Sequence, residues 1–238
     1  MSKKSIGFDF KQFHINHDQC TMKVGTDAVL LGAWTSIANA CRILDIGTGS
    51  GIIALMLAQR TSHETTINAI EPDHDSAQQA VKNVIHSPWA KKVVISETSL
   101  QNFHSPHQFD LIITNPPFFL NSQLPPSAKR SKARHTHSLS YQELIHATKQ
   151  LLTPQGRLSI VLPTVEGLHF QELARAENLY VIRQLSFFSR QGKSQERWLF
   201  EFSFTQQQIE KETLILHETG EAWSESYQQI TREFYTKL

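Results

Sequence analysis

Residues 45–51 read Asp-Ile-Gly-Thr-Gly-Ser-Gly, and this stretch decides the fold. It ends a short apolar run at 42–46, which is typical of a buried parallel strand. Apolar residues at helical spacing follow over 52–59. Glycines at alternate positions let the backbone turn tightly and approach a ligand closely. A strand, a glycine turn and a helix in this order predict a ligand site over the carboxyl end of the strand.

Strand-like and helix-like stretches continue to alternate along the chain. Further strands are predicted at 66–71, 93–95, 109–114, 157–162, 180–188 and 197–204, and helices at 26–37, 73–86, 141–152, 166–178 and 224–234. Asp73 is a good N-cap for the helix that follows it. The alternation predicts an α/β fold with a seven-stranded, mostly parallel sheet and helices on both faces. A hairpin-like turn at 191–194 predicts one antiparallel strand near the end.

Composition and charge limit the classes of function. Hydrophobic residues make up 39% of the 238 residues and charged residues 19%, which is typical of a folded, soluble protein. The net charge is +1, so any nucleic-acid site must be a local patch. The two cysteines, Cys20 and Cys41, form no Cys-x-x-Cys pair. Without a signal-peptide pattern or an apolar run of about 18–20 residues, we expect a cytoplasmic protein with no membrane span.

Two classes of cofactor bind at a glycine loop of this kind. The dinucleotide pattern Gly-x-Gly-x-x-Gly/Ala does not start at Gly47, but Gly49, Gly51 and Ala54 satisfy its alanine variant. The glycines alone therefore do not decide. Asp45 favours S-adenosylmethionine, because an acid before the turn repels a diphosphate but can engage the cofactor's ammonium, directly or through water.

A carboxylate at the end of the second predicted strand fits the same site. Glu71 lies 20 residues after Gly51, where it can accept hydrogen bonds from both ribose hydroxyls of a cofactor. NAD and S-adenosylmethionine share that ribose, so Glu71 supports the site without separating the two cofactors.

The stretch Asn-Pro-Pro-Phe at 115–118 follows the fourth predicted strand and indicates the chemistry. An exocyclic aromatic amine is a poor nucleophile because its lone pair is delocalised into the ring. The side-chain oxygen of Asn115 and the carbonyl of Pro116 can each accept one amine hydrogen and so aim the lone pair. Pro117 helps to fix the backbone, and Phe118 offers a flat face for a base. We therefore predict methyl transfer to an exocyclic amine without a strong general base.

With both motifs in place, the chain resembles the bacterial tRNA methyltransferases that make N6-methyladenine next to the anticodon of valine tRNA. The resemblance implies a Rossmann-like class I methyltransferase fold, S-adenosylmethionine as cofactor and adenine 37 of this tRNA as the target. The chain shows no internal repeat and no second domain, so we expect a single domain, with 1–40 as a cofactor-covering extension, 41–205 as the core and 206–238 as an appendage. The resemblance covers most of the chain and is carried by residues 10–13, 17–18, 22–27, 30–34, 44–47, 54–60, 87–90 and 115–117, with Tyr227, Phe234 and Tyr235 in the tail.

The resemblance also implies further cofactor contacts. Lys23, Thr26 and Asp27 are expected over the cofactor's methionine end, although Thr26 as a simple helix N-cap is an alternative. Members of the family often carry Asp after the third strand, where it binds the adenine amine. Here Ser99 occupies that position, and a hydroxyl accepts more weakly than a carboxylate. The family often has Tyr where this chain has Phe118, and stacking survives that change.

The segment 119–140 is polar, basic and without periodicity, and loops of this length are usually functional. Four cations in it follow the Asn-Pro-Pro-Phe stretch: Lys129, Arg130, Lys132 and Arg134. We expect them to contact tRNA phosphates, the alternative being a solvated charge run. His135 and His137 have no partner ligands at a suitable spacing, so no metal is expected.

Three other functions fit part of the pattern. A guanine-N2 methyltransferase of ribosomal RNA also carries Asn-Pro-Pro-Phe but usually brings a second, duplicated domain. A glutamine methyltransferase of release factors fits Asn-Pro-Pro-Tyr better and needs a peptide groove. A non-catalytic cofactor-binding RNA chaperone would not need Asn115 and Pro116. The sequence leaves the oligomeric state open, with a monomer slightly favoured.

Overall fold

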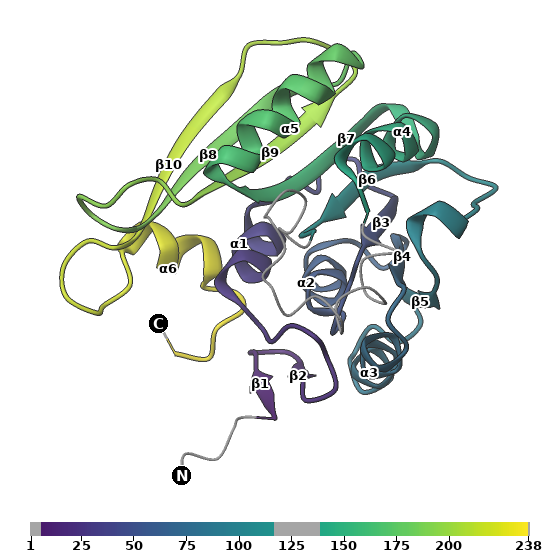
Figure 1. Ribbon diagram of the computed structural model, residues 1–238. Coiled ribbons are helices and arrows are strands. Elements are labelled where there is room, and N and C mark those ends of the chain that lie inside the picture. Colours follow the sequence, from purple (N-terminus) through teal and green to yellow (C-terminus); the bar gives the residue numbers. More distant parts are fainter. Residues whose placement is uncertain (1–5, 117–138, 238) are drawn as a thin grey trace, which may run out of the picture.

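A computed structural model describes residues 6–116 and 139–237 (Figure 1). Its elements, in chain order, are β1 (Gly7–Asp9), β2 (His14–Asn16), α1 (Thr26–Trp34), β3 (Arg42–Ile46), α2 (Ile52–Arg60), β4 (Thr66–Glu71), α3 (His74–Ile85), β5 (Val93–Glu97), the 3-10 helix η1 (Leu100–Asn102), β6 (Phe109–Thr114), α4 (Tyr141–Leu151), β7 (Leu152–Pro163), α5 (Thr164–Ala176), β8 (Tyr180–Arg190), β9 (Arg197–Ser203), β10 (Glu210–His217) and α6 (Glu225–Thr231).

The main sheet confirms the predicted α/β class and its single antiparallel strand. Its order is β10-β8-β9-β7-β6-β3-β4-β5. β9 runs antiparallel to both of its neighbours, and the other pairings of this sheet are parallel. The sheet has eight strands instead of the predicted seven, because β10 pairs with the edge of β8. Leu214 is the one buried residue of β10, so this strand lacks the alternating pattern that marks a strand in sequence.

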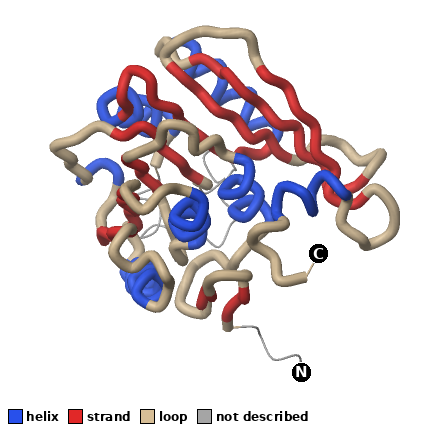
Figure 2. The backbone as a smooth tube through the Cα atoms, turned by 180° about the vertical axis from the view of Figure 1, so that it is seen from behind, coloured by secondary structure: helices blue, strands red, loops and turns tan. Residues whose placement is uncertain are grey.

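Helices cover both faces of this sheet, as predicted (Figures 1 and 2). Successive strand residues point to opposite faces. Ile43 therefore packs in the hydrophobic cluster that contains α1 and α2, whereas its neighbour Leu44 packs in the cluster that contains α4 and α5. The two apolar layers hold the parallel strands in place and leave their carboxyl ends at one common edge.

Local sequence signals set most of the element boundaries. The Asp73 carboxylate caps α3 by accepting from the Ser76 backbone N–H at 3.0 Å. Ser140 and Glu143 form a reciprocal capping box at the start of α4. α1 and α6 are shorter than predicted, and β7 begins at Leu152, where the predicted helix was expected to end. The hairpin ribbon of β1 and β2 was not predicted.

The two ends of the described chain lie together. Phe10 forms a backbone bridge to Tyr235, and the Lys11 N–H donates to the Phe234 carbonyl at 2.7 Å. The Phe10 and Phe13 rings stack with centroids 4.6 Å apart. This aromatic packing anchors the ribbon and so fixes the start of the segment that leads to α1.

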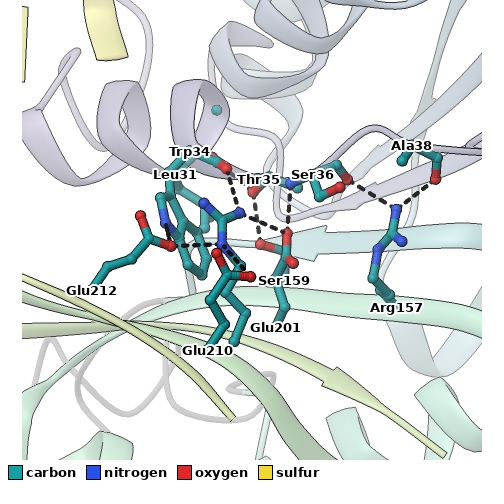
Figure 3. A network of polar contacts seen from close by, with 12 residues as sticks. Leu31, Trp34, Thr35, Ser36, Ala38, Arg157, Ser159, Glu201, Glu210 and Glu212 are labelled. Atoms are coloured by element: carbon teal, nitrogen blue, oxygen red, sulfur yellow. Dashed lines mark hydrogen bonds and ion pairs between the residues drawn. The ribbon is translucent and has the colours of Figure 1, made fainter. Parts of the chain in front are cut away.

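A polar network ties the end of α1 to the strands β7 to β10 (Figure 3). Arg183 on β8 contacts Glu212 at 2.6 Å, donates to the Trp34 carbonyl at 3.0 Å and lies 4.2 Å above the Trp34 ring. Glu201 on β9 is buried and accepts from the Ser36 N–H at 2.6 Å. α1 is therefore held by its end, while its first residues reach the carboxyl edge of the sheet.

Candidate active site

The residues after four neighbouring parallel strands meet at one edge of the sheet, the usual place for a ligand in this architecture. Two cavities lie there, one of about 590 Å³ and one of about 190 Å³. Both are lined by Met22, Gly47, Gly49 and Asn115. They therefore adjoin at the glycine loop and at the end of β6.

The glycine loop adopts backbone angles that other residues rarely adopt. Gly47, Gly49 and Gly51 have φ values of 70°, 56° and 83°. A Cβ at Gly47 or Gly49 would meet no atom within 4 Å, so backbone conformation and not space requires glycine at these two positions. Gly51 caps α2 and lines neither cavity, whereas Gly47 and Gly49 line both.

Glu71 is locked to this loop. One carboxylate oxygen accepts from the Gly49 N–H at 2.9 Å, and the other accepts from the Asp73 N–H at 3.0 Å. Burial raises the pKa of Glu71, and the two N–H donors partly oppose that rise. Each carboxylate oxygen has a second lone pair, so the group can still accept from a ligand hydroxyl in the smaller cavity.

Asp45 lies beneath the loop and lines neither cavity. One of its oxygens accepts from the Thr48 hydroxyl at 2.5 Å. Complete burial raises the pKa of this carboxyl to about 7. Thr48, which donates to Asp45, itself lines the larger cavity.

Asn115 occupies the junction of the two cavities. Its side-chain oxygen is buried and has no hydrogen-bond partner within residues 6–116 and 139–237. The preceding Thr114 hydroxyl donates to the Ile46 carbonyl at 2.9 Å, which fixes the end of β6 against β3. Pro116 lines the smaller cavity. Pro117, Phe118 and the four cations Lys129, Arg130, Lys132 and Arg134 lie outside the described residues.

The other sequence-predicted residues divide between the cavities. Lys23, Thr26 and Asp27 line the larger one, and Ser99 lines the smaller one. Gly25, and not Thr26, is the N-cap of α1, so the alternative of Thr26 as a helix cap is wrong. Asp27 forms an ion pair with Arg197, with 2.9 Å between the carboxylate oxygen and Nε.

The sequence did not predict one wall of the larger cavity. It comes from the end of β8, the start of β9 and from β10, and it includes Phe187, Ser189, Glu196, Arg197 and Leu216. The alternating pattern of β8 and β9 indicates only burial, so nothing local marked their ends as part of a site. In the smaller cavity, Thr98 and Gln101 beside Ser99 were missed as well.

Residues 6–116 and 139–237 give no sign of metal ligation or of a membrane-spanning helix. No group of three or more His, Cys, Asp or Glu side chains there is arranged to hold a metal ion. None of its helices combines the length and apolar character that crossing a bilayer requires.

Comparisons with known proteins agree with this architecture. Residues 22–176 match the model of the methyltransferase small domain family. A predicted O-methyltransferase from Agrobacterium tumefaciens superposes with a TM-score of 0.68 at 16% identity, covering 87% of this chain and 96% of that one. A putative RNA methyltransferase from Pyrococcus horikoshii superposes with a TM-score of 0.52 at 15% identity, covering 73% and 80%. At these identities the superpositions show a shared fold.

Curated relatives are much more similar in sequence. A protein of Tolumonas auensis that is named tRNA1(Val) (adenine(37)-N6)-methyltransferase is 43% identical over 231 residues, covering 97% of each chain. Proteins of Bacteroides thetaiotaomicron (43% identical, covering 97% of this chain and 98% of the relative) and Aeromonas salmonicida (40%, covering 99% of each) bear the same name. This chain therefore belongs to the methyltransferase small domain family and, within it, to the family of the tRNA1(Val) (adenine(37)-N6)-methyltransferases.

Proposed function

We propose that this chain transfers a methyl group from S-adenosylmethionine to N6 of adenine 37 in tRNA1(Val). The names of its full-length relatives support the reaction and the substrate. The structural observation that carries the proposal is the Asn115 side-chain oxygen, buried and unpartnered among the described residues where the two cavities adjoin. A buried polar atom without a partner is costly, and a ligand that donates a hydrogen bond removes that cost.

The two cavities suit different parts of the cofactor, the smaller one its adenosine and the larger one its amino-acid end. The smaller cavity combines apolar walls, such as Ile46 and Leu100, with the Glu71 carboxylate, which suits an adenine ring and a ribose. Ser99 lies in that cavity as an acceptor for the adenine amine. When bound, the cofactor supplies an electrophilic methyl group on a sulfonium sulfur.

The larger cavity suits the cofactor's amino-acid end. Lys23 and Asp27 line it with opposite charges, and Thr26 adds a hydroxyl at the start of α1. The buried Asp45 supports the loop from below through Thr48 and contributes negative charge when ionised. This division leaves Asn115 between the adenosine part and the amino-acid part of the site.

Asn115 and Pro116 then prepare the acceptor. Each carbonyl oxygen accepts one hydrogen of the adenine N6 amine, which directs the nitrogen lone pair at the methyl group. The amine becomes acidic when it is alkylated, so its proton passes to water without a dedicated base. Phe118 stacks on the base, and Lys129, Arg130, Lys132 and Arg134 hold the tRNA backbone. Because tRNA is the substrate, the proposed site of action is the cytoplasm.

The test is a substrate comparison. The protein is incubated with radiolabelled cofactor and, in separate reactions, unmodified total tRNA, ribosomal RNA and a release factor. We expect N6-methyladenosine in valine tRNA. Label in N2-methylguanosine or in methylglutamine would overturn the substrate while leaving the fold and the cofactor in place.

A further inference from the structure

Asn83 on α3 connects the glycine loop to residues 16–25, which lead from the N-terminal ribbon to α1 and are called the covering segment below, although Asn83 lines neither cavity. Asn83 is 2% exposed and lies in the last turn of α3, a helix that contacts β2. Its side-chain amide donates to the Ser50 carbonyl at 2.8 Å and to the Asn16 carbonyl at 2.8 Å. Ser50 belongs to the glycine loop, and Asn16 ends the N-terminal ribbon.

Every hydrogen-bonding position of this amide is used. Its oxygen accepts from the Asn16 N–H at 3.0 Å and from the Gln79 amide at 3.4 Å. An asparagine side chain has two donor hydrogens and two acceptor lone pairs, so Asn83 satisfies all four in a buried site. Buried networks that are completely satisfied hold one geometry, and losing one member leaves the others unpaired.

The covering segment is attached to the same helix at two further points. Lys82 donates to the Gln19 side chain at 3.2 Å, and the Thr21 N–H donates to the Ser76 hydroxyl at 3.5 Å. Directly after Thr21, Met22 lines both cavities and Lys23 lines the larger one. α3 thus holds the covering segment along its length, and Asn83 is the point where that segment and the glycine loop share one side chain.

We infer that Asn83 is a positioning residue for the cofactor, acting through Ser50 and Asn16 and not by contact. Its hydrogen bonds hold the glycine loop and the covering segment at a fixed distance from each other. The cavity walls that these two segments form are therefore already in place before the cofactor binds. This inference rests on the proposed cofactor site but not on the choice of RNA. Preorganisation of this kind strengthens binding by removing the cost of ordering the walls.

The experiment compares Asn83→Ala with Gln78→Ala, an exposed amide on the same helix. Binding of S-adenosylhomocysteine is measured by calorimetry, and methyl transfer is measured as kcat and as KM for the cofactor. We expect Asn83→Ala to weaken binding and raise KM about tenfold, the equivalent of one or two lost hydrogen bonds, with kcat at saturating cofactor little changed. Gln78→Ala should match the wild type.

Hydrogen exchange separates positioning from general stability. In Asn83→Ala, amides of residues 17–25 and of the glycine loop should exchange faster together, while those of β3 and β6 stay protected. Unchanged binding of S-adenosylhomocysteine by a folded variant would overturn the inference. If the wild type itself failed to bind this ligand, the proposed cofactor site would be at fault instead.

If Asn83→Ala does not fold, the variant Lys82→Met tests whether α3 positions the covering segment. The Lys82 ammonium bonds to Gln19 at an exposed site, and its loss releases the covering segment there without disturbing the core. A few-fold weaker binding of S-adenosylhomocysteine would support the coupling through α3. Wild-type affinity in this variant would contradict it.

Discussion

The two halves of the sheet contribute differently to the site. The half formed by β3, β4, β5 and β6 ends in the glycine loop, Glu71, Ser99 and Asn115, which line the smaller cavity with polar atoms. The half formed by β7, β9, β8 and β10 is rich in ion pairs that hold α1, and it supplies only the far wall of the larger cavity. In the proposed function, the first half therefore supplies the groups that act on the substrate, and the second half holds α1, whose first residues line the larger cavity.

This difference has a physical reason. In the proposed mechanism the Asn115 oxygen must be free to accept from the substrate amine, whereas an anchoring group such as Arg183 acts through the partners it already has. Substitutions of cavity-lining residues such as Asn115 in the first half should therefore impair binding or turnover more than stability, and substitutions of anchoring residues such as Arg183 in the second half should do the reverse.

The largest effect is expected from Asn115→Ala in the first half. Removing a preorganised group that acts in the transition state typically lowers kcat by about 10²–10³-fold. Binding of S-adenosylhomocysteine and the urea midpoint should stay near wild type, because the oxygen has no partner among the described residues. Asn102→Ala, at an exposed position in η1, is the control. Unchanged turnover in Asn115→Ala would remove the proposed mechanism.

In the second half, Arg183→Met should mainly lower stability. The change leaves the buried Glu201 without its cation, 3.8 Å away in the wild type, and removes the ion pair to Glu212. Breaking a buried pair in this way costs about 3 kcal/mol. Urea unfolding measures the loss, with the exposed Arg175→Met as control. If Arg183→Met lost turnover while its free energy of unfolding stayed at the wild-type value, Arg183 would act in binding or catalysis and not as an anchor.

Asp45→Asn tests the charge beneath the glycine loop. Burial raises the pKa of Asp45 from its ordinary value of 3.8 to about 7 in the folded protein. The ionised carboxylate is disfavoured in the folded state, so the wild type loses stability as the pH rises from about 4 to about 7.

The variant should lack this loss. The free energy of unfolding of Asp45→Asn, relative to that of the wild type, should therefore increase between about pH 4 and about pH 7 and stay constant above that range. The increase should be about 1.4 kcal/mol for each unit by which the pKa of Asp45 differs between the folded and unfolded states. Urea unfolding at several pH values, without cofactor, measures the difference. A constant difference between the two proteins from about pH 4 to about pH 8 would show that Asp45 does not titrate there.

The smallest change in stability is expected from Arg197→Gln. This residue pairs with Asp27 at the edge of the larger cavity, where both side chains are partly exposed at 28% and 21%. Such pairs contribute about 1 kcal/mol or less. Binding of S-adenosylhomocysteine should still weaken, because Asp27 loses its position on the cavity wall.

Arg190→Gln provides the matched comparison for Arg197→Gln. Arg190 lies on the same hairpin and pairs with Glu221, but it lines neither cavity. Its loss should leave binding unchanged. Equal binding losses in the two variants would indicate that the hairpin as a whole, and not the Asp27 pair, shapes the site.

The sequence by itself determined the α/β class, the glycine loop and the clustering of strand ends. Each of these depends on local patterns: apolar runs predict the parallel strands, and parallel strands that alternate with helices must end at one edge. Glu71 and Asn115 needed only their positions after predicted strands to be placed at that edge. The local rule also explains why the Asp73 cap was predicted correctly.

The tertiary structure decided what depends on partners distant in sequence. β10 became a strand because the edge of β8 was available to pair with it, and Arg197 entered the site because β9 begins opposite α1. Asn83 meets Asn16 and Ser50 across 67 and 33 residues of chain. No local periodicity encodes such contacts, because they form only when packed layers bring separate segments within hydrogen-bonding distance.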